Sequence, residues 1–188
     1  MIRYLLNKML LTLTKHYHYD VRYQQDILQA DLAAFLKFMG FQTMATHSGP
    51  VPLDALYAAR IGALLSEDCG PCTQLAVDLA LEAGVPPTII QAIVQRDVAA
   101  LPTEVALVVN FTELVLTRKP EADALREDDV LREEIVALWG QQGLIALAFA
   151  ISAYRVYPAL KYALGYGKAC NQVIVAQQAV VPGKAPEQ

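Results

Sequence analysis

The sequence is poor in cysteine and in clustered basic residues, and each shortage excludes a class of protein. Its 188 residues include three cysteines, too few for the disulfide framework of a small secreted domain. We therefore expect a cytoplasmic, reducing location. Lys and Arg total 15 against 19 Asp and Glu, which gives a net charge of −4. Without a basic stripe, the chain is not expected to bind nucleic acid.

The sequence also lacks an evident leader and a long apolar run. Asn7 and Lys8 interrupt the apolar N-terminal segment, and no small-residue cleavage site follows. Its apolar positions recur at helical spacing, which predicts an amphipathic first helix. The apolar run 143–153 is shorter than the roughly 20 residues that cross a bilayer, so it predicts a buried helix. No membrane partner is expected.

The sequence is rich in hydrophobic residues. Hydrophobic residues make up 55% without glycine, and the 10 glycines bring the fraction to about 60%, above the ~45–50% usual for soluble domains. The sequence predicts one domain over 1–181 with more apolar helix surface than a single core can bury. The remaining apolar surface predicts a homo-oligomer. Residues 182–188 are expected to form a frayed tail.

Nearly every segment has the helical period, and strand-like alternation is restricted to 172–175. The pattern predicts an all-α fold of about eight helices. Polar or Gly/Pro-rich segments at 46–52 and 119–126 predict a loop and a linker. In the second helix, Ile27, Leu28, Leu32, Phe35, Leu36 and Met39 are expected on one buried face. The expected helices are 2–16, 23–41, one from 53, 69–82, 87–98, 102–118, one ending near 139–140, and one from 143 that kinks or ends before Pro158.

The most informative motif is Cys69-Gly70-Pro71-Cys72, which opens a predicted helix. Two cysteines at this spacing can close a disulfide. Backbone N–H groups and the dipole at a helix N-terminus also stabilise a thiolate, the species that attacks peroxides and disulfides. Ser66 and Asp68 are candidate N-caps for this helix. Gly62, in the preceding helix, has two interpretations: it weakens the prediction of a helix there, or its bare backbone lets a neighbouring helix approach.

Three other interpretations of the cysteine pair were weighed. A thioredoxin site needs a buried strand and a βαβ unit, whereas the segment before Cys69 has a helical pattern, so this interpretation is rejected. A zinc site needs four ligands, and the further candidates lie far away in the sequence, so no metal is expected. Two buried structural cysteines remain the open alternative. The distant zinc-ligand candidates are His16, His18, His47 and Cys170.

The motif is followed by Leu79-Ala80-Leu81-Glu82-Ala83-Gly84-Val85 and a further helix from Pro87. Over about 50–165 this arrangement resembles the alkylhydroperoxidase D and carboxymuconolactone decarboxylase superfamily, and 1–45 is then an N-terminal extension. The resemblance implies an orthogonal helical bundle that oligomerises. In the CxxC branch it implies peroxide reduction, with Cys72 as the nucleophile, Cys69 as the resolving thiol, an external dithiol as reductant and no cofactor.

The sequence departs from the family pattern at the proton relay. The family places a His four residues after the second Cys and a Glu about twelve before the first, where this chain has Ala76 and Tyr57. Glu67, Asp68 and Gln74 are the candidate substitutes, with Tyr57 and Arg60 as further possibilities. Decarboxylation fits poorly because that branch does not rely on a CxxC.

Several polar residues have two interpretations. Asp68 is either a base or, as we favour, a plain N-cap. Arg60 either faces the thiols or, as we favour, lies on a solvated helix edge, and Arg155 faces a pocket or forms an interfacial salt bridge. His16 and His18 are two residues apart and do not share a helix face, which favours a surface position. The expected function is a thiol oxidoreductase acting on a small hydroperoxide or disulfide; the alternative is a non-catalytic helical oligomer of the same superfamily.

Overall fold

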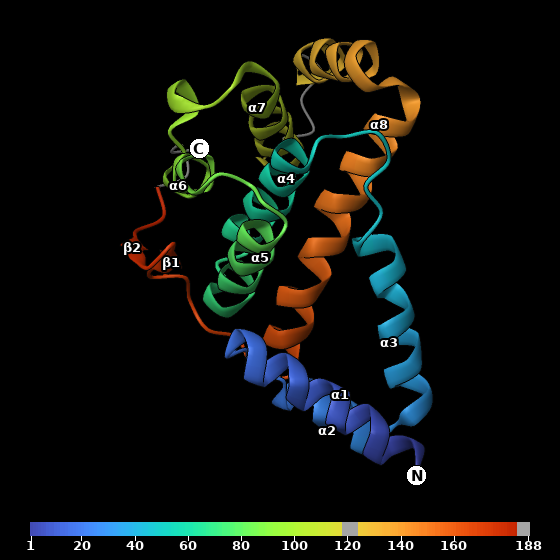
Figure 1. Cartoon of the computed structure of the whole chain (residues 1–188). Helices are drawn as coiled ribbons and strands as arrows, with labels where there is room; N and C mark the ends of the chain where they lie inside the picture. Colours follow the sequence, from blue (N-terminus) through green and yellow to red (C-terminus); the bar gives the residue numbers. More distant parts are fainter. Residues whose placement is uncertain (118–123, 184–188) are drawn as a thin grey trace.

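The helical periodicity of the sequence becomes eight α-helices in the part of the chain that the computed structural model describes, residues 1–117 and 124–183 (Figure 1). The all-α class is therefore confirmed, with one small sheet near the C-terminus. A short 3₁₀ turn, η1, covers Val98–Ala100. The α-helices are α1 (Ile2–Tyr17), α2 (Arg22–Ala30), α3 (Leu32–Ala45), α4 (Leu53–Ser66), α5 (Gly70–Glu82), α6 (Pro87–Gln95), α7 (Thr103–Thr117) and α8 (Ala124–Ala163).

The central helix is α4, which packs against α5, α6, α7 and α8. Alanines at 55, 58, 59 and 63 are fully buried in it, and their small side chains let the neighbouring helices come close. A Cβ on Gly62 would lie 3.2 Å from Cγ2 of Thr112 on α7. The expectation that Gly62 admits a neighbouring helix is thus confirmed.

The helix predicted over 23–41 is wrong in one respect, because it is two helices that meet at Asp31. The backbone of Asp31 is extended, and its Oδ1 accepts hydrogen bonds from the N–H groups of Ala33 at 2.8 Å and Ala34 at 3.1 Å. This is an N-cap, which starts α3 in a new direction. Leu36, expected on the buried face, is 47% exposed as a result.

The long helix α8 is interrupted at Gly140, where φ is 67° and ψ is −178°, near the predicted helix end. It then continues through Pro158 to Ala163, although Pro158 was expected to end or kink it. Pro158 is itself buried, so tertiary packing offsets the lost hydrogen bond. The linker predicted at 119–126 falls largely outside the described residues, and α8 has begun by Ala124.

The predicted extended piece is confirmed as β1 (Val173–Val175), which pairs antiparallel with β2 (Gln178–Val180). β1 packs against α5, with Val173 and Val175 buried. The N–H of Gly183 donates to the carbonyl of Val94 on α6. The start of the expected frayed tail is therefore held in place, and residues 184–188 lie outside the described part.

Buried side chains form two clusters. The larger extends from Val51 to Val180 around α4, and the smaller joins Leu10, Tyr19, Val21, Tyr23, Leu28 and Phe35 of the N-terminal helices. In Figure 1, α1 to α3 form an arm beside the C-terminal half of α8. Within the described residues one helical segment, Asp129–Ala163, is long and apolar enough to cross a membrane by length and composition, and 33% of its 18-residue apolar window is buried. The run 143–153, expected to be a buried helix, is only partly buried, because Ile145 and Phe149 are exposed.

Candidate functional site

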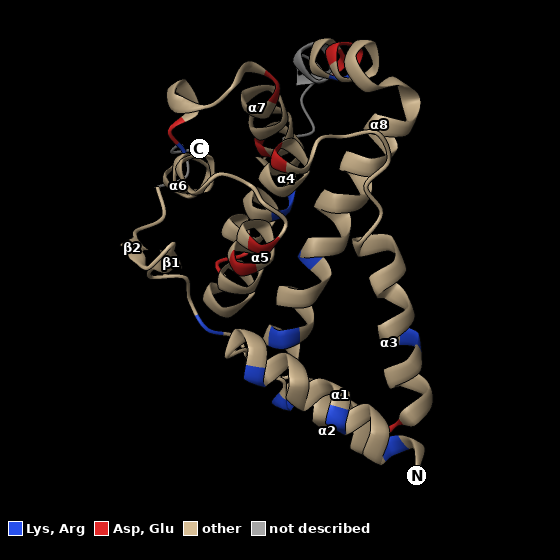
Figure 2. Ribbon diagram, viewed as in Figure 1, with Lys and Arg blue, Asp and Glu red and all other residues tan. Residues whose placement is uncertain are grey.

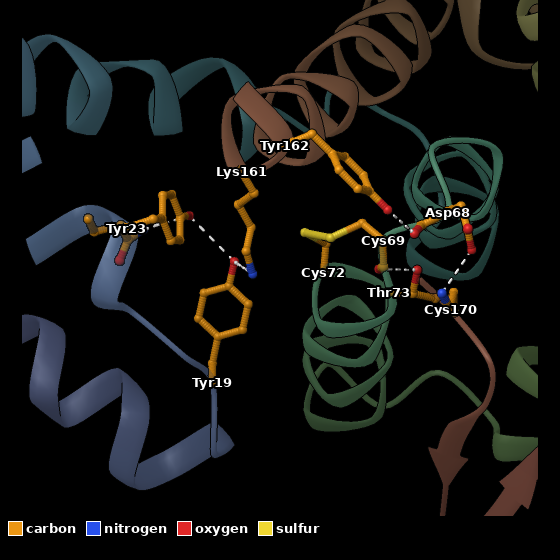
Figure 3. The surroundings of a disulfide bond; sticks show 10 residues. Tyr19, Tyr23, Asp68, Cys69, Cys72, Thr73, Lys161, Tyr162 and Cys170 are labelled. Carbon is orange, nitrogen blue, oxygen red and sulfur yellow. Dashed lines mark hydrogen bonds between the residues drawn. A yellow bond between two sulfur atoms is a disulfide. The ribbon is translucent and has the colours of Figure 1, made fainter. Parts of the chain in front are cut away.

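The two motif cysteines form a disulfide where α4 turns into α5 (Figure 3). Asp68 turns the chain with a φ of 49°, and Cys69 is the extended residue that precedes α5. The Cα atoms of Cys69 and Cys72 are 5.3 Å apart, within the usual range for a disulfide. Cys69 is fully buried and Cys72 is 5% exposed.

The N-cap expectation for Ser66 and Asp68 is wrong. The Ser66 hydroxyl donates to the carbonyl of Ala63 at 2.8 Å, and Cys69 occupies the cap position without a side-chain cap bond. Pro71 stands in the first turn of α5, where its missing N–H costs nothing. The start of α5 is therefore set by proline and by the turn at Asp68, and its N-terminus lies at the cysteine pair.

Asp68 instead holds the C-terminal segment against the motif. Its Oδ1 accepts from the N–H of Cys170 at 2.8 Å, and its carbonyl accepts from the Tyr162 hydroxyl at 2.7 Å. A Cβ on Gly70 would lie 2.6 Å from the carbonyl oxygen of Ala169, so glycine permits this approach. Cys170 is distant only in sequence. Its thiol is free and half-buried, and burial raises its pKa.

Glu67 and Gln74 are also held by other parts of the chain. The Arg155 guanidinium donates to Glu67 Oε1 at 2.6 Å, so the Arg155 salt bridge lies within the chain. Gln74 bonds the main chain of Ile174 twice, accepting its N–H at 2.7 Å and donating to its carbonyl at 3.0 Å. Gln74 thereby acts as a strand partner for β1.

A cavity of about 730 Å³ lies between α1, α2, α3, α4, α5 and α8. Cys72 lines it, whereas Cys69 does not, and neither do the substitute candidates Glu67, Asp68 and Gln74. The structure therefore separates these three residues from the cavity. Ala76 and Tyr57, which stand where the resembled family pattern has a His and a Glu, do line it.

Arg60 also lines this cavity, and its expected place on a solvated edge is wrong. The residue is 6% exposed, because α8 packs on α4 and the last residue of α3, Ala45, reaches the guanidinium. Its guanidinium carbon lies 4.9 Å from the ring centre of Tyr57 and 5.4 Å from that of Tyr154. Nη2 donates to the carbonyl of Ala45 at 3.1 Å, while Nε is buried with no partner.

Lys161 is a buried cation that the sequence did not single out. It is 2% exposed, and its ammonium donates to the Tyr19 hydroxyl at 3.4 Å (Figure 3). Burial lowers its pKa to about 8, opposed by the charge of Asp20. Tyr19 and Tyr23, whose rings it faces at 4.6 and 5.3 Å, line the cavity. The feature of the sequence that could have pointed to Lys161 is that it is the single lysine in the apolar C-terminal half of α8.

Over the described residues, no group of three or more His, Cys, Asp or Glu side chains is placed to hold a metal ion. His16 lies at the surface, with Nε2 3.5 Å from Glu82 Oε1. The neighbouring Tyr17 hydroxyl donates to the same carboxylate. These contacts tie the end of α1 to the end of α5 beside the cavity.

Comparison of the chain with protein-family models, with curated proteins and with solved structures found no match.

Proposed function

We propose that the protein is a thiol-dependent oxidoreductase that reduces a small hydroperoxide or disulfide through Cys72 and Cys69. The proposal is carried by one observation: Cys72 is bonded to Cys69 at the N-terminus of α5 and lines a cavity of about 730 Å³. Cavities of this size hold small organic ligands. Since Cys69 does not line the cavity, Cys72 is the cysteine that a substrate there would meet.

The reaction begins with the reduced pair. The Cys72 thiolate attacks the distal oxygen of the hydroperoxide, the O–O bond breaks, and the alkoxide leaves and takes up a proton to become an alcohol. Cys72 is now a sulfenic acid. The Cys69 thiol attacks its sulfur, water leaves, and the disulfide forms. An external dithiol then reduces this disulfide by two exchanges and is itself oxidised to a disulfide.

Two features would favour the thiolate of Cys72. The N-terminus of α5 places the positive end of a helix dipole at the cysteine pair. Lys161 supplies a cation among the residues that surround the disulfide (Figure 3), and a nearby positive charge lowers a thiol pKa. The protein is proposed to work as a cytoplasmic homo-oligomer that meets its dithiol in solution.

The second candidate function is a non-catalytic helical oligomer. It is favoured by the relay positions, since Ala76 and Tyr57 face the cavity with neither the imidazole nor the carboxylate that the family uses. In that case the disulfide only stabilises the turn between α4 and α5, by restricting the unfolded chain.

Hydroperoxide consumption in the presence of a dithiol separates the two functions. We expect the Cys72→Ser variant to lose activity. Treated with hydroperoxide in the absence of dithiol, the Cys69→Ser variant should keep a sulfenic acid on Cys72, because the resolving thiol that would expel water is gone. Cys170→Ser is the matched control and should keep the wild-type rate, since Cys170 is outside the disulfide. Equal consumption by wild type and Cys72→Ser would reject the oxidoreductase proposal.

A further inference from the structure

Arg60 is a buried cation in a cavity whose lining is mainly apolar and aromatic, with five further polar residues: Thr12, His16, Gln24, Gln42 and Thr46. The lining has no Asp or Glu side chain, and Arg60 is its sole Lys or Arg among the described residues. Within the residues that the structure describes, the guanidinium makes one hydrogen bond, to the carbonyl of Ala45, and its Nε is buried without a partner. A guanidinium has five N–H donors, so most of its capacity is unused.

Burying a charge without a counter-charge is costly. The rings of Tyr57 and Tyr154 offset part of this cost through cation–π contact at 4.9 and 5.4 Å. Contact with both rings also restricts where the guanidinium can lie. Its position is therefore set before an anion binds. A carboxylate matches the guanidinium fork, since two parallel N–H···O bonds can form.

Two of the helices around the cavity and the C-terminal half of a third carry basic charge alone, whereas α5 carries Asp78 and Glu82 and no basic residue (Figure 2). α1 and α3 contain Lys or Arg and no Asp or Glu, and the same is true of α8 from 141 to 163. The buried ammonium of Lys161 lies against Tyr19 and Tyr23, which line the cavity. In the lining itself Arg60 is the one residue among Lys, Arg, Asp and Glu that the described chain contributes, so its charge favours a negatively charged ligand.

One part of the lining is suited to a hydrocarbon chain. It includes apolar side chains of α1, α3 and α5, namely Met9, Leu10, Leu13, Phe38, Met39 and Leu75. We propose that the cavity binds an amphipathic monocarboxylate, with its carboxylate on Arg60 and its apolar chain against these side chains. As a substrate the ligand would be such an acid bearing a hydroperoxide group, a step that rests on the proposed function; the binding itself does not.

Binding is measured by titration calorimetry with decanoate and with decanol, each below its aggregation concentration. The protein is the full chain carrying Cys69→Ser and Cys72→Ser, so that no thiol chemistry contributes. We expect decanoate to bind at least tenfold more tightly than decanol. Arg60→Met should weaken decanoate about 30-fold or more, the loss typical of removing one partner of a buried charge pair, and should leave decanol nearly unchanged.

Arg155→Met is the matched control, because this arginine pairs with Glu67 and does not line the cavity; it should bind decanoate as the parent does. If Arg60→Met does not fold, the decanoate-to-decanol ratio of the parent and the Arg60→Lys variant decide the question. Lysine keeps the charge and loses the bidentate geometry, so we expect an intermediate affinity.

Equal affinity for decanoate and decanol, or no binding of either, would overturn the proposed ligand class. The outcome is independent of the redox proposal. Carboxylate binding by the serine variants with no hydroperoxide turnover by wild type would support the ligand site and reject the oxidoreductase. Hydroperoxide turnover by wild type, without a preference of the serine variants for decanoate over decanol, would support the oxidoreductase and reject the ligand site.

Discussion

The N–H of Cys170 donates a 2.8 Å hydrogen bond to Oδ1 of Asp68, which fixes the third cysteine against the motif that contains the other two. Its thiol is nevertheless free. The hydrogen bond holds the main chain of Cys170, so its side chain is placed by the C-terminal segment and not by the disulfide. The molecule therefore contains one disulfide-bonded pair and one neighbouring free thiol, which can be distinguished by experiment.

Mild oxidation of the reduced protein is expected to consume two thiols and leave Cys170 reduced. The reason is that Cys69 and Cys72 are bonded across one turn, whereas burial raises the pKa of Cys170 and so lowers its thiolate fraction. Thiol counting and peptide mapping after alkylation measure this. A mixed disulfide of Cys170 with one motif cysteine, leaving the other reduced, would contradict it.

Gly70→Ala is expected to destabilise the protein by about 1–3 kcal/mol, the usual cost of overpacking. The new Cβ would lie 2.6 Å from the Ala169 carbonyl oxygen, and backbone cannot move aside cheaply. Urea unfolding measures the change. Gly40→Ala is the control: it lies within α3 with nothing within 4 Å of its Cβ, so stability should stay equal or rise. Equal effects of the two substitutions would show that the 168–170 segment does not depend on Gly70.

The sequence was sufficient for the class, for most helix positions and for the disulfide spacing, because these depend on local periodicity and on residues three apart. For Gly62 the sequence left two interpretations open, and the contact with Thr112 on α7 decides for the close approach of a helix. The break at Asp31 was missed because its cap signal lies inside a continuous helical pattern, with no Gly or Pro to mark it.

The composition of the cavity could not be predicted, because it depends on packing between distant segments. Arg60 is buried because α8 packs on α4 and the end of α3 lies against the guanidinium at Ala45, and no local pattern encodes these contacts. Likewise, Asp68 stands at a position typical of an N-cap, yet its carboxylate accepts a hydrogen bond from the N–H of Cys170. A contact with a segment about a hundred residues away competes successfully with the local cap.

Lys161 should give the protein a stability that rises with pH. Burial lowers its pKa in the folded state to about 8, from about 10.5 when unfolded. Between these values the unfolded chain binds more protons, so unfolding becomes less favourable as pH increases. Relative to Lys161→Met, the wild type should gain about 1–2 kcal/mol between pH 7 and 9.5. Urea unfolding of both proteins at the two pH values tests this, and a constant difference would contradict it.

The exposed apolar face of α8 predicts self-association. Ile145, Phe149 and Val156 are exposed large hydrophobic residues, and their spacing places them on one side of the helix. We expect at least a dimer at micromolar concentration, and Ile145→Glu with Val156→Glu should shift it to monomer. Gln141→Glu is the charge control, and sedimentation velocity is the measurement. A monomeric wild type would contradict the expected assembly.

The last prediction concerns the missing relay. Ala76 is one turn after Cys72 and lines the same cavity, so a histidine there would face the nucleophile. General-base help is commonly worth ~10²–10⁴-fold, and we expect Ala76→His to raise the hydroperoxide rate by about 10²-fold. The gain should appear as the imidazole loses its proton, near pH 6.5. Steady-state rates from pH 5.5 to 8 measure it.

Adding Tyr57→Glu should give no further gain. The Arg60 guanidinium lies over the Tyr57 ring at 4.9 Å, so a carboxylate at position 57 would pair with Arg60 before it could orient a histidine. Leu79→His is the distance control, since Leu79 lines the cavity two turns from Cys72 and should leave the rate unchanged. If a folded Ala76→His variant shows no gain and no new titration, then either another group already transfers the proton or hydroperoxide is not the substrate.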